Sequence, residues 1–584
     1  MKNEEETENK GDESEDAAPE KPGFIGRIMA SVDSRYPKLA QRLRDMRVQV
    51  LLLFIILLIF YLNLIIWDFY FSSDSVPYGN IMKGWFEEGE IDSYELLRPA
   101  HPLTMPLAIA FTYLMIPLIG HNYLLSYAVL NAILGAATVA IFYWVCQQFA
   151  RSWKFSLLCA LGLAFSFAFW ENCEMAEDKS LGFFLFAITV PVLFAFAGEI
   201  KPFSWFENLP VWQKGLVTGI FMGLVLAAHV SFVLFFLFSL FLLWRYKGFK
   251  FFIGKGFICY ILGSAFVCGI VFGIVAVALE AEGIGGFIGM FTEYHTGEGA
   301  QQYFALAEPE EFSLTTQVRG TAGGVFTTLF MFISSEPAYY SAIIVTGFVV
   351  LLIMAYVIIS ARKNKVASSF FVLYVIWFAN YFFFAPDDRN AWVYLLVPVW
   401  LSICIGLDMM EKEGIRLILF RREMPDKMKS AVTPIAAVVV AILLANNVVV
   451  FADAHLNHDD REEFVNFADD NIPEDDAIII GDESLVGFFN YYSDRSAVHY
   501  GGVVTNPAVS DEINASFLSG TPVYLAEFWL LDSYVVKGSP RTEKTYEARL
   551  ELHRQYVERF ESMYNHTLAY RHEWSDIHII TGLK

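Results

Sequence analysis

Long apolar runs are the feature that most limits what this chain can fold into. The first run, Val48 to Trp67, is long enough to cross a membrane as a helix, and similar runs recur as far as residue 451. Hydrophobic residues make up 55% of the chain, and the mean hydropathy is +0.44. A soluble protein of this length would not concentrate its apolar residues in such runs. The pattern therefore predicts a polytopic membrane protein.

Polar ends delimit eleven apolar runs. They fall near residues 48–67, 103–119, 122–148, 155–170, 180–197, 215–244, 256–279, 338–360, 368–385, 391–409 and 431–451. The run 103–119 would be only roughly 25 Å long as a helix and contains prolines, so we expect it to lie in the interface. The run 215–244 would be roughly 45 Å long and is interrupted by "AHVS" around His229, so we expect two short helices. The prediction is an all-α bundle of about 11 transmembrane helices.

Basic residues indicate the orientation of the bundle. With these two choices, all the strongly basic loops fall on one side, and the positive-inside rule makes that side cytoplasmic. The opposite loops keep only Lys83, Arg98, Lys179, Arg319 and Arg389. We therefore expect a multi-pass integral membrane protein with a cytoplasmic N-terminus and an extracytoplasmic C-terminal domain.

Three segments follow from this division. Residues 1–47 form a cytoplasmic N-terminus, acidic and disordered at first and then basic. Residues 48–451 form the transmembrane domain. We expect residues 452–584 to form a small α/β domain. Its predicted strands are "AIIIG", "VYLAEF" and "DIHII", and its predicted helices are a short one through Phe488–Tyr492 and an amphipathic one over Lys544–Tyr564.

A short acidic joint separates two apolar runs, with the sequence "ENCEMAEDK". It holds Glu171, Glu174, Glu177, Asp178 and Lys179. One interpretation is a solvated turn between two spans. In the other, Glu171, Glu174 and Asp178 lie one helical turn apart and line one face at the mouth of the bundle. The second interpretation predicts the wall of a site.

The first outer segment has a similar character. Asp74 follows the first span closely, and Arg98 and His101 precede the interfacial helix. Asp74 could instead cap a helix, and Arg98 and His101 could contact lipid headgroups. Together, these residues predict an acid, a cation and an imidazole at the outer surface, facing the acidic joint.

At this point the sequence resembles the GT-C superfamily of membrane glycosyltransferases, and within it the protein O-mannosyltransferase-like family long filed as a domain of unknown function. The similarity rests on Asp74, "HPL" at His101–Leu103, Asn131 with "AILGAATVAIFYW", "AFWENCEMAED", "AHVS", and "DDRNAWVYLLVPVWL" from Asp387. It covers roughly residues 48–410. The resemblance implies a polyprenyl-phosphate sugar donor, mannose-like, and a protein or glycolipid acceptor.

The sequence departs from the family pattern in two places. Leu103 and Thr104 replace the usual second proline and glycine after His-Pro, and Glu177-Asp178-Lys179 replaces the usual Glu-Val-Tyr. The second departure leaves open which carboxylate faces the substrate. The resemblance also leaves a divalent metal open, because mannosyltransferase relatives need none whereas oligosaccharyltransferase relatives hold one between two loop acids.

Sugar transfer from a lipid phosphate to a hydroxyl needs a base for the hydroxyl proton and groups that stabilise the departing phosphate. We assign Asp74 as the base and Glu177 or Asp178 as groups that orient hydroxyls of the acceptor or the sugar. The candidate phosphate and substrate ligands are Arg98, His101, Lys179, Glu174 and Arg389. We interpret His229 as a packing or helix-breaking residue.

Two other classes of protein fit this topology. A secondary transporter would place ionisable groups near the middle of the membrane, often in repeated halves, and neither feature is visible. The other alternative is a flippase or a non-catalytic scaffold that displays the outer domain. The expected partners are the lipid-linked donor, its acceptor and the bilayer, and no nucleic acid.

Overall fold

A computed structural model describes most of the chain. The described residues are 45–67, 75–89, 93–150, 152–201, 203–281, 283, 285–286, 314–331, 337–384, 386, 388–413, 429–456, 460–473, 477–481, 483–493, 495–526, 555–556, 558–572 and 576–584. Asp74 and Asp387 lie outside them, as do residues 1–44 and most of the predicted helix Lys544–Tyr564.

Membrane-spanning helices make up most of the described chain. Ten of its helices are long and apolar enough to cross a membrane, or eleven if one bent pair forms a single span. They are α3 (Met46–Trp67), α7 (Tyr123–Ala150), α10 (Lys179–Ala197), α12 (Val211–Ala228), α13 (Val233–Lys247) together with residues 230–232, α14 (Lys255–Ala278), α18 (Pro337–Ser360), α19 (Lys365–Phe384), α21 (Leu396–Glu413) together with residues 389–395, and α23 (Val432–Leu456). The bent pair is α8 (Trp153–Ala164) and α9 (Phe167–Glu174), which meet at 64°. The predicted bundle of about 11 helices is confirmed, and the chain is a multi-pass integral membrane protein.

Both ambiguous apolar runs adopt the predicted secondary structure. The first becomes α6 (Thr104–Ile119), which is shorter than the spans, although its predicted place in the interface stays a prediction. The second is interrupted at His229, whose extended backbone (φ −161°, ψ 130°) ends α12. A short 3-10 turn, η2 (Val230–Phe232), then leads into α13.

Shorter helices connect the spans. They are α4 (Ser75–Lys83), the π-helix η1 (Gly84–Glu88), α5 (Ser93–Leu96), α11 (Ser204–Glu207), η3 (Phe249–Ile253), α17 (Leu314–Leu329), η5 (Ala361–Lys363), α20 (Arg389–Trp392) and η6 (Val393–Leu395). Of these, α4, α20 and η6 contribute side chains to the site described below.

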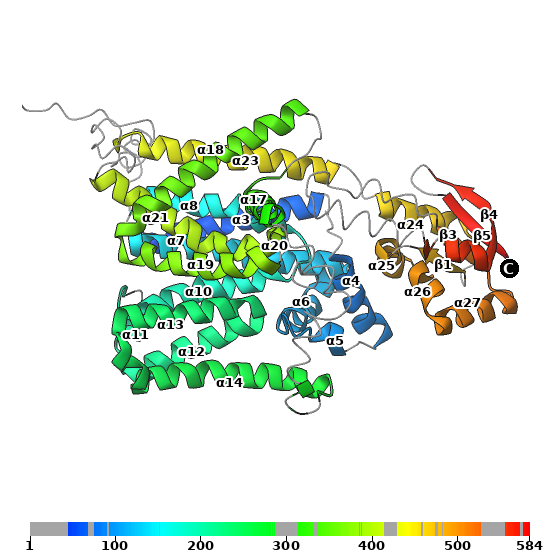
Figure 1. Ribbon diagram of the computed structural model, residues 1–584, viewed down its shortest axis with the longest axis horizontal. Helices are drawn as coiled ribbons and strands as arrows, with labels where there is room; N and C mark the ends of the chain where they lie inside the picture. Colours follow the sequence, from blue (N-terminus) through cyan, green and yellow to red (C-terminus); the bar gives the residue numbers. More distant parts are fainter. Residues whose placement is uncertain are drawn as a thin grey trace, which may run out of the picture. The chain divides into compact units, whose positions relative to one another are not determined.

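Glycines allow α12 and α14 to approach each other closely. A Cβ atom on Gly215 would lie 2.0 Å from the carbonyl oxygen of Gly256, and one on Gly219 would lie 2.1 Å from that of Tyr260. Small residues let helix backbones meet in this way inside membranes. The two helices lie side by side in the green part of the bundle (Figure 1).

The C-terminal region is an α/β domain built on one five-stranded sheet. Its strand order is β2-β1-β3-β5-β4; β1 pairs in parallel with β2 and β3, and β5 pairs antiparallel with β3 and β4. The strands are β1 (Ile478–Gly481), β2 (Ser496–His499), β3 (Val523–Ala526), β4 (Tyr564–Arg571) and β5 (Asp576–Leu583), and the helices are α24 (Asp460–Asn471), α25 (Glu483–Tyr492), α26 (Tyr500–Thr505) and α27 (Pro507–Ser519).

Helices cover both faces of this sheet. Ile479 belongs to a core shared with α24 and α25, and its neighbour Ile480 belongs to a core shared with α26 and α27. Alternate residues of a strand point to opposite faces, so both faces of β1 are buried. The three predicted strands are confirmed as β1, β3 and β5, whereas β2 and β4 were not anticipated.

Candidate functional site

The acidic joint is buried inside the protein. The exposed fractions of Glu171, Glu174, Glu177 and Asp178 are only 2–5%. The interpretation of this joint as a solvated turn is therefore wrong. The prediction that Glu171, Glu174 and Asp178 share one helical face is also wrong, because α9 ends at Glu174 and Met175 is extended.

A buried asparagine shapes the joint. The side-chain amide of Asn131 on α7 donates hydrogen bonds to the carbonyl oxygens of Met175 (2.7 Å) and Glu177 (2.8 Å). The hydroxyl of Ser180 donates to the carbonyl oxygen of Asn172 at 2.7 Å. These contacts satisfy backbone groups that have no water to bond to, and they turn the chain back into α10.

Asp178 lies at the centre of a charged cluster. One of its oxygens is 2.9 Å from Nε2 of His101, and the other contacts the ammonium group of Lys179. Burial alone would raise the pKa of Asp178, but Lys179 and His101 hold it well below its usual range. Asp178 is therefore an ionised carboxylate within a buried ion pair.

The helix break at His229 fixes the loop that carries His101. The backbone amide of Val230, just after the break, donates to the carbonyl oxygen of Ala100 at 2.8 Å. The His229 ring lies 6.1 Å from the His101 ring and accepts a hydrogen bond at Nδ1 from the amide of Ser231. Burial and the nearby Lys179 lower the pKa of His229 to about 3, so its imidazole is neutral.

Aromatic side chains that the sequence did not single out surround the cluster. Tyr78 on α4 lies 6.3 Å from the His101 ring and 5.8 Å from that of Tyr127, and the Arg98 guanidinium lies 5.2 Å from the Tyr78 ring centre. Tyr394 on η6 lies 5.3 Å from His229. Tyr127 and Tyr394 fall in apolar runs, where they look like any packing residue, and no sequence signal marks Tyr78 in its polar segment.

Among the residues that the structure describes, three buried polar atoms around the cluster have no hydrogen-bond partner: Nδ1 of His101 and the hydroxyls of Tyr127 and Tyr394. Buried polar groups are nearly always paired in folded proteins, since leaving one unpaired costs about 1–3 kcal/mol. Such groups next to an ion pair form an arrangement that a polar, charged ligand can satisfy.

Two further candidate residues make contacts with α9. Arg389 on α20 donates from Nε to an oxygen of Glu171 at 2.8 Å, and from its terminal nitrogen to the other oxygen. Glu174 accepts a hydrogen bond from the indole of Trp170. Thus the structure places Arg98, His101, Glu177, Asp178 and Lys179 in one neighbourhood, while Glu174 and Arg389 contact other parts of α9.

No group of three or more metal-ligating side chains with suitable geometry occurs within the described ranges. The Asp178 carboxylate already binds Lys179 and His101. No step of the chemistry below depends on a divalent ion, and the chelator experiment described below tests whether one is required.

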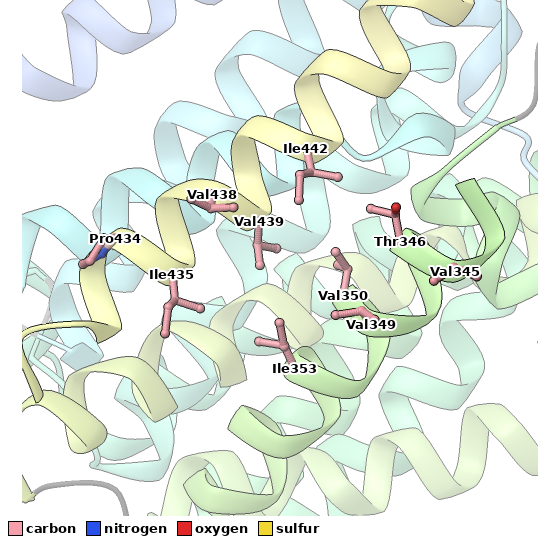
Figure 2. A pocket seen from close by; sticks show the side chains of 10 residues that line it. All are labelled: Val345, Thr346, Val349, Val350, Ile353, Pro434, Ile435, Val438, Val439 and Ile442. Atoms are coloured by element: carbon pink, nitrogen blue, oxygen red, sulfur yellow. The ribbon is translucent and has the colours of Figure 1, made fainter. Parts of the chain in front are cut away.

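A hollow of about 430 Å³ lies between α18 and α23 and is lined almost entirely by apolar side chains (Figure 2). Its lining is Val345, Thr346, Val349, Val350, Ile353, Pro434, Ile435, Val438, Val439 and Ile442. It holds no group that could act on a substrate.

The sequence matches no protein-family model and no curated protein. The fold, however, resembles solved structures. The chain superposes on ArnT from Cupriavidus metallidurans, solved with bound undecaprenyl phosphate, with a TM-score of 0.56 at 11% identity over 91% of this chain and 98% of that one. It superposes on the Archaeoglobus fulgidus oligosaccharyltransferase tethered to an acceptor peptide with a TM-score of 0.50 at 10% identity, over 93% of this chain and 74% of that one.

These similarities establish the fold. These solved structures share the fold of the described chain, which is a bundle of membrane-spanning helices followed by a small domain that contains a sheet. The narrower resemblance to the protein O-mannosyltransferase-like family stays a prediction.

Proposed function

We propose that this protein is a membrane glycosyltransferase that moves a sugar from a polyprenyl-phosphate donor to a hydroxyl group of a protein or glycolipid acceptor. The GT-C fold supports the class of enzyme, and the undecaprenyl phosphate bound to ArnT supports the class of donor. A mannose-like sugar is the narrower form of the proposal. The predicted orientation places the reaction on the extracytoplasmic face.

The buried cluster around Asp178 is the observation that carries this proposal. Lys179 and the Arg98 guanidinium supply positive charge, and His101 supplies a ring nitrogen, beside the rings of Tyr78 and Tyr127. A lipid phosphate needs such groups, because cations and hydrogen-bond donors act most strongly where water is excluded. When no anionic ligand is bound, the buried cations need another negative charge beside them. The Asp178 carboxylate provides that charge.

The residues account for each step of the transfer. The acceptor oxygen forms a bond to the anomeric carbon of the sugar as the bond from that carbon to the phosphate oxygen breaks. Both electrons of the broken bond go to the phosphate, which gains one negative charge that Lys179 and Arg98 stabilise. The acceptor proton goes to Asp74, the assigned base, while Glu177 or Asp178 orients hydroxyls.

A turnover assay tests this proposal. Purified protein in lipid is given radiolabelled polyprenyl-phosphate monosaccharides and candidate acceptors, with and without chelator. We expect the wild type to transfer one sugar, and we expect Asp74→Asn to abolish transfer with an unchanged melting temperature. Lys179→Met should lower turnover at least tenfold, while Lys412→Met, at a lysine whose side chain is 60% exposed, should not.

The outcomes separate the rival classes of protein. Equal turnover by the wild type and Asp74→Asn would remove Asp74 as the base. A protein that moves labelled lipid across the bilayer without cleaving it would be a flippase, and one that does neither would be a scaffold. If the wild type transfers sugar without chelator and loses this activity when chelator is added, the reaction requires a metal ion.

A further inference from the structure

Helix α4 has little stability of its own. It is only 9 residues long and includes Pro77 and Gly79, both poor helix formers. Isolated helices shorter than about 12–15 residues are marginal in water. The position of α4 must therefore come from the elements that pack against it.

The carboxyl end of α25, in the C-terminal domain, binds α4 through Lys83. The ammonium group of Lys83 donates to the carbonyl oxygens of Asn490 (3.1 Å), Tyr491 (3.2 Å) and Ser493 (3.3 Å). The last carbonyls of a helix lack partners within it and carry partial negative charge, so a lysine there is favourable. A further hydrogen bond between the two helices runs from the side-chain amide of Asn80 to the carbonyl oxygen of Gly487, at 3.1 Å.

Tyr491 fills a notch in α4. A Cβ atom on Gly79 would lie 2.8 Å from the Tyr491 ring and 2.9 Å from the Leu124 side chain, so only glycine leaves room for both. The Tyr491 hydroxyl accepts a hydrogen bond from the amide of Leu124, in the first turn of α7, at 3.2 Å. Tyr491 thus joins α25, α4 and α7.

Other side chains of α4 belong to the candidate site. Tyr78 is 4% exposed and contacts His101, Tyr127 and Arg98. The helix begins at Ser75, which directly follows Asp74 in sequence. The same nine residues therefore meet the C-terminal domain and the charged cluster.

We propose that the C-terminal domain positions the reaction site: α25 fixes α4 through Lys83 and Tyr491, and α4 fixes Tyr78 and the chain next to Asp74. Lys83 and Tyr491 are positioning residues and do not touch the substrate. The effect on turnover rests on the proposed function, whereas the coupling between α25 and α4 does not.

Hydrogen exchange in the full-length protein tests the coupling without any assay of activity. We expect the α4 amides to exchange at least tenfold faster in Tyr491→Ala and in Lys83→Met than in the wild type. The amides of α10 should be unchanged, which shows that the bundle is folded. Tyr491→Phe keeps the ring and should restore most of the protection.

Matched controls truncate exposed side chains elsewhere. Leu518→Ala changes a 74% exposed residue on α27 of the same domain, and Lys154→Met removes an exposed lysine on α8. Both should leave α4 exchange at the wild-type rate. Unchanged α4 exchange in Tyr491→Ala and Lys83→Met would overturn the proposal.

Steady-state kinetics tests the consequence for the reaction. Because the two residues act by placing the site, kcat should fall about tenfold in Tyr491→Ala while the donor KM changes less than about twofold. A raised donor KM with unchanged kcat would contradict positioning. If α4 exchange accelerates but the wild type transfers no sugar, the coupling stands and the proposed glycosyltransferase function fails.

Discussion

Nε2 of His101 lies 2.9 Å from the Asp178 carboxylate and thereby joins two loops that are far apart in sequence. One loop precedes α6 and the other precedes α10. Both side chains are buried, at 4% and 3% exposed. This contact connects the first outer segment to the acidic joint, and the proposed reaction depends on it.

Asp178→Asn should abolish sugar transfer and lower stability. The substitution leaves Lys179 without its charge partner inside the protein, and breaking a buried pair typically costs about 3–5 kcal/mol. Melting temperature and donor turnover measure the two effects. Asp408→Asn is the matched control, because Asp408 pairs with the largely exposed Lys412, and we expect it to cost less than about 1 kcal/mol. A similar loss in both variants would contradict a special role for Asp178.

His229 should make stability depend on pH. Its pKa is lowered to about 3 in the folded protein, against about 6.5 in an unfolded chain. The unfolded state therefore binds the extra proton first as the pH falls. Stability from this group is complete above pH 6.5 and falls by about 1.4 kcal/mol per pH unit below it, until the pH approaches the folded value.

Melting curves between pH 4 and 8 measure this dependence. His229→Asn should flatten the curve below pH 6.5, because the asparagine carbonyl can still accept the hydrogen bond from Ser231 but does not titrate. An equally steep curve in the variant would assign the dependence to other groups. Asp178 should add slope only at the acidic end of this range, because its pKa is lowered in the folded protein and an aspartate in the unfolded chain binds its proton near pH 3.9.

Gly135→Ala should destabilise the protein through Cys173. A Cβ atom at Gly135 would lie 2.2 Å from the Cys173 sulfur, and overpacking of this kind typically costs about 1–3 kcal/mol. The double variant Gly135→Ala/Cys173→Ala removes the sulfur but keeps the Cβ atom of residue 173, which would lie 2.9 Å from the added Cβ atom, so it should recover only part of the loss in melting temperature. If the loss of melting temperature in the double variant equals the sum of the losses in the two single variants, the two positions do not interact.

Glu171 and Arg389 should behave as one unit. Glu171→Gln and Arg389→Met should each lower stability, by about 1–3 kcal/mol, because each leaves part of a two-point ion pair unsatisfied. The double variant should lose less than the sum of the two. A double-mutant cycle of melting temperatures measures this coupling, and strict additivity would argue against the ion pair.

The sequence was sufficient to predict most of the helices and three of the five strands, but not which loops meet. Run length and loop charge identified the spans and the break at His229, because these are local properties of the chain. Local patterns also identified β1, β3 and β5, which are apolar. Strand β4 was missed because its residues alternate poorly between buried and exposed, and β2 because it has only four residues.

For the candidate site too, the sequence identified single residues but not the contacts between distant segments. The carboxylates stood out because charge is rare in apolar runs, so Asp178 was identified before its partners. Asp178 was predicted to share a helical face with Glu171 and Glu174 because the helix was extended past Glu174, where Asn131 in fact holds a turn. Tyr78 and Tyr394 could not be identified, since only the fold brings them to His101 and His229.

The helix break at His229 also fixes how far the surrounding chain can change in length. The amide of Val230 is bound to Ala100, so both α12 and α13 are held at the point where they meet. Removing or adding one residue near the break would rotate one of these helices by about 100° relative to that point. The loops at the far ends of α12 and α13 are free of this constraint, so insertions should be tolerated there and not at the break.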